Sequence, residues 1–262
     1  MERIKTLIDK EWAEAFKNKM VLGTVVFMPL IFMVIPLFQL ALMRNIPASE
    51  LNDIPSTILA GCQVQNFTGS ECMQGFLVNQ FLLLFLLIPL AVPVTIASYS
   101  IVGEKSTRSL EPLLATPTST AEIILGKALA SVIPAIGATL VAFVIFLVGA
   151  RFFVVSDRVY ALFMNPTWYV AMLVVAPLMT VLSVNIAIII SSRVSDPRAA
   201  EQLGMLVMLP LMLMFFGAIL GVIPLNVTTM LLLAVVTLAL DAGLVVLGVK
   251  LFQRETILTR WK

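Results

Sequence analysis

The largest group of charged side chains between two apolar runs lies in residues 103–127. Ser119-Thr120-Ala121-Glu122 matches a helix N-cap followed three positions later by an acid, so a helix is expected to begin there. Upstream, the mixture of charge and leucine predicts a short surface helix that docks on a soluble protein; the alternative is a solvated connector. The residues that would make this contact are Glu104, Lys105, Arg108, Leu110, Glu111, Leu113 and Leu114.

A second polar segment, residues 191–202, is shorter and similar in kind. It carries Asp196 and Arg198 on either side of Pro197. Both could add a second contact for the same partner.

One acid lies inside an apolar run. Asp241 would cost at least about 2.5–3.5 kcal/mol to place in lipid, so such residues are functional candidates. The functional interpretation is an acid on a proton or ion pathway. The alternative is a protonated or hydrogen-bonded carboxyl that faces other helices and has Asn185 as a partner.

Other chemistry has little basis in this sequence. It has no His, no CxxC, no acidic metal cluster and no GxxxxGK[ST] phosphate loop, so we expect no metal or cofactor on the chain and no enzymatic activity of its own. Its two cysteines, Cys62 and Cys72, lie in a polar stretch on the side expected to face away from the cytoplasm, where disulfides persist. A Cys62–Cys72 bridge is predicted; two free thiols are the alternative.

The elements that must position these residues are membrane helices. Apolar residues make up 60% of the chain and charged residues 12%, against roughly 45–50% and about 25% in globular proteins. Six runs are long enough to cross a bilayer as helices, which takes roughly 20 residues each. They cover residues 20–43, 77–101, 123–150, 168–191, 203–223 and 227–250.

Prolines recur inside these runs, at positions 29, 36, 89, 93, 134, 177 and 210. They are either ordinary residues of membrane helices or kinks that let helices open and close a pathway.

The basic residues set the orientation. Fourteen of the 17 Lys and Arg fall in the N-terminal segment, the loops after the second and fourth runs, and the C-terminal end. The remaining three are Arg44, Arg151 and Arg158. Because cytoplasmic segments carry the excess of positive charge, both termini are expected in the cytoplasm.

The N-terminal residues 1–19 form a separate element. Ile4, Leu7, Ile8, Trp12, Ala15 and Phe16 follow helical spacing, and most charged residues, Glu11 among them, are assigned to the other face. An amphipathic helix lying in the membrane interface is therefore predicted; the alternative is a charged leader that only fixes the topology. Residues 20–252 would form the membrane domain, with an outer loop at 44–76 and a cytoplasmic loop at 102–122, and residues 253–262 a cytoplasmic tail.

The segment from Gly103-Glu104-Lys105 through Leu110-Glu111-Pro112-Leu113-Leu114 to Leu125-Gly126-Lys127 resembles the second–third loop of permease subunits of type-2 ATP-binding-cassette (ABC) exporters. The likeness extends over the whole chain to the closing Leu251–Leu258, and is nearest to the sodium- and drug-efflux branch. Sodium exporters of that branch usually have a large outer domain after the first span. The short outer loop here argues against sodium as the substrate.

The resemblance implies an all-α fold of six spans after an amphipathic helix, in a prokaryotic plasma membrane. It implies that residues 104–117 form a coupling helix on a separate ATPase subunit that holds ATP and Mg. It also implies two ATPase copies and a second permease copy, identical or related, with no nucleic acid as partner.

Two other classes compete with an ATP-driven exporter. A gradient-driven transporter or channel would use Asp241, and internal inverted repeats, which are not evident, would favour it. An intramembrane enzyme or assembly factor is disfavoured because His, paired acids and a nucleophile motif are all missing.

Overall fold

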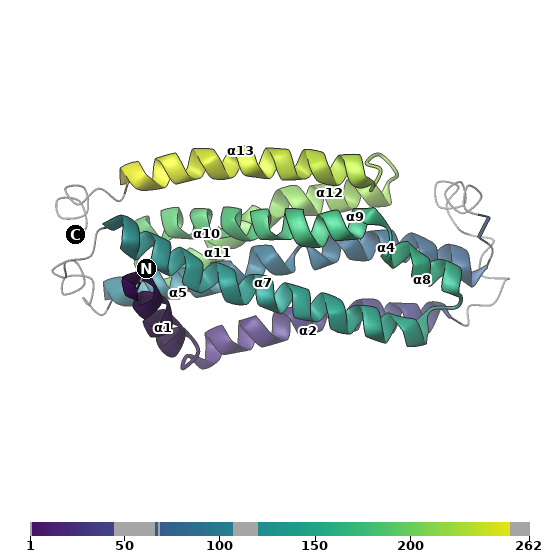
Figure 1. Cartoon of the computed structure of the whole chain (residues 1–262), viewed down its shortest axis with the longest axis horizontal. Coiled ribbons are helices and arrows are strands. Elements are labelled where there is room, and N and C mark those ends of the chain that lie inside the picture. The colour runs from purple at the N-terminus through teal and green to yellow at the C-terminus, as the bar shows by residue number, and fades with distance from the viewer. Residues whose placement is uncertain (1, 45–65, 68, 107–119, 252–262) are drawn as a thin grey trace.

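The computed structural model describes residues 2–44, 66–67, 69–106 and 120–251, and within them it contains helices and no strands. The helices form an elongated bundle (Figure 1). Six stretches are long and apolar enough to cross a membrane: Lys19–Met43, Ser70–Glu104, Glu122–Phe153, Asp157–Arg193, Pro197–Ile219 and Val227–Gly248. This confirms the predicted all-α membrane fold with six spans.

Several of the spans are built from more than one helix. In chain order the elements are α1 (Glu2–Ala15), α2 (Lys19–Met43), α4 (Ser70–Phe85), α5 (Ile88–Ser106), α7 (Thr120–Phe153), α8 (Asp157–Phe163), α9 (Pro166–Val170), the π-turn η2 (Ala171–Val175), α10 (Ala176–Arg193), α11 (Pro197–Gly204), the 3₁₀ turn η3 (Met205–Met208), α12 (Leu209–Ile219) and α13 (Val227–Leu251).

The span made of α4 and α5 lies at the centre of the bundle. In its most apolar window 94% of the residues are buried, against 11% for the span made of α11, η3 and α12. Helix α5 contacts α1, α2, α7, α10 and α11, so its side chains can connect elements that are far apart in sequence. A span enclosed in this way faces protein on all sides, whereas the others also face lipid.

A proline follows each of the four breaks within the spans, and Pro166 follows the one between α8 and α9. A proline has no N–H and its ring clashes with the carbonyl four residues earlier, which favours a rearrangement of the preceding turn. Pro89 follows the break between α4 and α5, Pro177 follows η2, and Pro210 follows η3. Helix α2 continues through Pro29 and Pro36 without such a break.

The two ends of the bundle differ. At one end, which we call the α1 end, helix α1 lies across the end of α5 and the start of α7 (Figure 1, left). At the other end, Gln74 of α4 donates to the carbonyls of Leu40 and Phe153 and accepts from the Val155 amide. Gln74 therefore joins the ends of three segments, while the α1 end is held by charges.

Helix ends depart from the predicted boundaries. Helix α4 begins at Ser70, inside the predicted outer loop 44–76. Helix α5 continues to Ser106 and helix α7 begins at Thr120, so both overlap the predicted loop 102–122. The short helix predicted between them, and the tail 253–262, lie outside the described residues.

Candidate functional site: a buried charge cluster at the base of segment 107–119

Four charged side chains from three helices meet at the α1 end of the bundle. Lys10 and Glu11 come from α1, Glu104 from α5 and Lys127 from α7. Glu11, Glu104 and Lys127 are 3%, 4% and 6% exposed. Two acids and two bases leave the cluster neutral, which lowers the cost of burying it. Glu104 and Lys127 lie on the two helices that flank residues 107–119.

Lys127 is the centre of this cluster. Its Nζ lies 2.7 Å from Glu11 Oε1 and 2.7 Å from Glu104 Oε2, and it donates to Ser100 Oγ at 2.9 Å. Ser100 in turn donates to Glu11 Oε2 at 2.5 Å. An ammonium group has three donors, and three acceptor oxygens lie within 2.9 Å of the Lys127 nitrogen.

Lys10 closes the cluster on the solvent side. Its Nζ lies 2.7 Å from Glu104 Oε1 and 3.8 Å from Glu14. Partial burial disfavours the charge of Lys10, but the hydrogen bond and charge of Glu104 outweigh it and raise the pKa of Lys10 above 10.5. A raised lysine pKa stabilises the fold below its unfolded-state value and loses that effect as pH rises through the folded-state value, so this contact persists at neutral pH.

Uncharged contacts also hold α1 in place. Trp12 Nε1 donates to the Ala130 carbonyl of α7 at 2.9 Å. Leu7 is 7% exposed and packs over Gly126, where an added Cβ would lie only 3.1 Å from Leu7 Cβ. Gly126 therefore provides the space in which α1 crosses α7.

The assignment of Glu11 to the polar face of α1 is wrong. Leu7, Glu11 and Ala15 follow one another at four-residue intervals, so all three lie on one helix face, and all are buried against the bundle. An acid in the middle of an apolar stripe, together with Lys127 near the start of an apolar span, was the signal that could have revealed the cluster. Sequence reasoning used Lys127 only for orientation and as part of the loop motif.

The residues expected to contact a partner protein are only partly within the described chain. Glu104 is buried and its carboxylate is used by Lys10 and Lys127. Lys105 lies in the last turn of α5. The remaining five, Arg108, Leu110, Glu111, Leu113 and Leu114, lie outside the described residues.

The second predicted contact lies at the start of α11, at the same end of the bundle. Asp196 caps this helix by accepting from the Arg198 amide at 2.7 Å, and both side chains are exposed. One turn further on, Glu201 accepts from Thr95 of α5 at 2.6 Å. Helix α5 is thus bonded both to α11 and to the charge cluster.

The intramembrane pair consists of Asp241 on α13 and Asn185 on α10. Asn185 Nδ2 donates to Asp241 Oδ1 at 3.1 Å, and Asp241 is 5% exposed. Asp241 Oδ2 is buried and has no hydrogen-bond partner among the described residues. The pair joins two spans by one polar contact.

Cys72, at the start of α4, is buried against Phe67 and Leu162 and takes part in a disulfide bond. Cys62, its predicted partner, lies outside the described residues, so the pairing itself stays a prediction.

Comparison with known proteins agrees with this architecture. The sequence profile of the family described as "ABC-2 family transporter protein" matches residues 5–240, from the first turns of α1 to the turn of α13 that holds Asp241. The chain therefore belongs to the ABC-2 family of transporter proteins, and it is a membrane permease component of an ABC transporter. No curated protein sequence matches it. The sodium- and drug-efflux branch is not established by this match.

Proposed function

We propose that this chain is the permease subunit of an ATP-driven exporter and that its segment 102–122 docks on a separate ATPase subunit. The observation that carries the proposal is the ion pair of Glu104 with Lys127, which joins the two helices on either side of residues 107–119. A force applied to that segment would reach both helices together. Because the sequence has no phosphate-binding loop, ATP and Mg are assigned to the partner.

The charge cluster would spread this movement to other spans. Glu11 ties α1 to Lys127, and α1 is followed after three residues by α2. Thr95 and Glu201 tie α5 to α11, where Asp196 and Arg198 are exposed for a second contact with the ATPase. Glu104 is thus a positioning residue rather than a contact residue.

We further propose an orientation of the permease in the membrane and a subunit composition for the transporter. The α1 end carries exposed Lys17, Lys19 and Arg193, which favours its placement in the cytoplasm of a prokaryotic cell. Each permease offers one docking segment, so two ATPase copies that close on ATP require two permeases, either identical or related, with the pathway between them.

A gradient-driven transporter is the second candidate, and it would depend on Asp241. Its support is the buried Oδ2 atom without a partner in the described chain. Membership of the ABC-2 transporter family favours ATP over an ion gradient as the energy source.

The test is co-purification of the permease with its proposed ATPase partner, followed by native mass measurement. Leu113→Glu together with Leu114→Glu should abolish ATPase binding and leave membrane insertion and the permease dimer intact. The unsubstituted complex should contain two copies of each subunit. Undiminished ATPase binding by the double variant would overturn the docking assignment, and a single permease per complex would overturn the assembly.

A further inference from the structure

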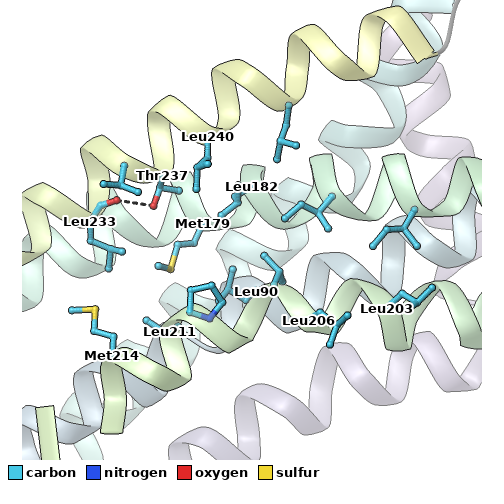
Figure 2. A pocket seen from close by; sticks show the side chains of 16 residues that line it. Leu90, Met179, Leu182, Leu203, Leu206, Leu211, Met214, Leu233, Thr237 and Leu240 are labelled. Atoms are coloured by element: carbon cyan, nitrogen blue, oxygen red, sulfur yellow. Dashed lines mark hydrogen bonds between the residues drawn. The ribbon is translucent and has the colours of Figure 1, made fainter. Parts of the chain in front are cut away.

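An apolar groove lies between α13 and the span made of α11, η3 and α12, with α10 as its floor (Figure 2). Its volume is about 540 Å³, within the roughly 300–1,000 Å³ of ordinary ligand pockets. Leu240 of α13 and Leu206 of η3 border the opening, and Leu90 of α5 and Met179 of α10 lie in its buried floor.

The groove exists because the fifth span is not a regular helix. Pro210 lines it, and the 3₁₀ turn Met205–Met208 precedes that proline. Helix α13 packs along α10 and η2, so it leaves a space beside the interrupted span.

The lining can bind little except hydrocarbon. Among the described lining residues Thr237 alone has a hydrogen-bonding side chain. Its hydroxyl donates to the Leu233 carbonyl of its own helix at 2.7 Å (Figure 2, dashed line). An ion or sugar placed there would lose its water contacts without replacement, so its binding is strongly disfavoured.

The opening lies on the exposed apolar side of the bundle, within the length of the membrane-crossing spans. Leu206, Val236 and Leu240 are 55%, 54% and 52% exposed, and the helices that carry them are two of the membrane-crossing spans. A ligand can therefore enter sideways from the hydrocarbon region.

The size of the groove selects a slim occupant. One turn of α-helix, 5.4 Å long and about 10 Å across, fills on the order of 400 Å³, so the groove holds little more than one turn. A membrane-crossing helix of a second copy needs several turns. A single alkyl chain is thinner and can lie along the groove.

From this lining, opening and size we propose that the groove binds the hydrocarbon chain of a long-chain amphiphile that the transporter removes from the bilayer. This inference rests on the proposed function, since it names the class of substrate for an ATP-driven permease. The groove binds the hydrocarbon chain of the amphiphile. That hydrocarbon chain would lie beside the interface between α10 and α13, which Asn185 and Asp241 connect.

The test uses the permease with its ATPase partner in lipid vesicles and palmitic acid carrying a mid-chain diazirine as probe. Illumination should attach the probe to groove residues such as Leu206. Leu240→Trp should fill the groove and lower this labelling several-fold. Leu238→Trp is the matched control, because Leu238 is 57% exposed on the same helix and does not line the groove.

A second measurement distinguishes a transported chain from a resident lipid. Added palmitic acid should change the ATPase rate of the wild-type and Leu238→Trp complexes and not that of the Leu240→Trp complex. Equal labelling in both variants, or labelling without any effect on the ATPase rate, would overturn the proposal. ATPase co-purification reports separately on the proposed function, because none of these positions belongs to the docking segment.

Discussion

At the scale of single residues, Lys127 carries the strongest prediction. Lys127→Met removes the cation between Glu11 and Glu104 and leaves two carboxylates buried. Breaking a buried ion pair costs about 3–5 kcal/mol. We expect a clearly lower unfolding midpoint in detergent, whereas Lys17→Met, at an exposed position of the same end, should change little.

Neutralising the acids provides the complementary variant. Lys127→Met combined with Glu11→Gln and Glu104→Gln should recover much of the lost stability, because the unpaired buried charges cause most of the loss. Lys10 would lose its closest partner, but its side chain is 38% exposed and can be hydrated. A single Lys127→Met variant as stable as Lys17→Met would contradict the role of the cluster.

Asp241 gives a second prediction at this scale. In Asp241→Asn the new amide oxygen can still accept from Asn185, so assembly and transport should persist. Asp241→Leu leaves the half-buried Asn185 amide without its acceptor and should cost on the order of 1 kcal/mol, the usual worth of such a bond in membranes. Thermal unfolding and a transport assay measure both. Complete loss of transport in a well-assembled Asp241→Asn variant would favour the gradient-driven alternative instead.

Only some of the site residues could be predicted from the sequence. Glu104 could be named because it belongs to a recognisable segment, and Asp241 because an acid inside an apolar run is conspicuous. The residues that Glu104 contacts in the folded chain could not be identified from such local patterns. Glu11 and Glu104 are 93 positions apart, and only the docking of α1 on α5 and α7 brings them to one lysine. A periodic pattern gives the face of a helix but not the surface against which that face packs.

At the scale of elements, the docking of α1 depends on Gly126. Gly126→Val would place a Cβ 3.1 Å from Leu7 Cβ, with two methyl groups beyond it, so α1 must shift. Overpacking of this kind costs about 1–3 kcal/mol. Hydrogen exchange of the α1 amides should therefore become faster.

The matched control for this variant is Gly137→Val. Gly137 lies on the same helix with nothing within 4 Å of its added Cβ. Both changes place a β-branched residue in α7, so any difference between them reports on α1. If exchange of α1 is the same in both variants, α1 is not held through this contact.

The helix ends also mark the limit of sequence prediction at this scale. Hydropathy located each span because a bilayer requires about 20 apolar residues. It missed that α4 begins at Ser70 and that α5 continues to Ser106, since polar residues such as Gln74 and Glu104 interrupt the apolar pattern there. Both side chains have buried partners within the bundle, and these partners offset the cost of placing them among apolar helices.

At the scale of the whole molecule, the count of six spans and their helical nature followed from the number and length of the apolar runs, whereas their arrangement did not. The central position of the second span is an example. Its sequence is no more apolar than that of its neighbours, with the same mean hydropathy of 2.5 as the first and third spans. Its burial comes from the elements that surround it, among them α1, α2, α7, α10 and α11, and no single segment specifies that arrangement.

The orientation in the membrane remains a prediction, and it can be measured directly. We expect the α1 end in the cytoplasm because most of the basic residues belong to it. Single cysteines at Lys17, Arg193 and Val222 would test this in a background in which Ser replaces both native cysteines. Lys17 and Arg193 are exposed at the α1 end, and Val222, 74% exposed, lies in the turn between α12 and α13 at the opposite end.

A membrane-impermeant maleimide applied to intact cells should label Val222→Cys alone, and Lys17→Cys and Arg193→Cys should react only after the cells are broken. The two α1-end positions must behave alike, because Lys17 precedes the first span and Arg193 ends the fourth, and an even number of crossings separates them from each other. Labelling of Lys17→Cys in intact cells would place segment 107–119 outside the cell, away from ATP. That result would remove the basis for coupling to a cytoplasmic ATPase, whatever the charge cluster does for stability.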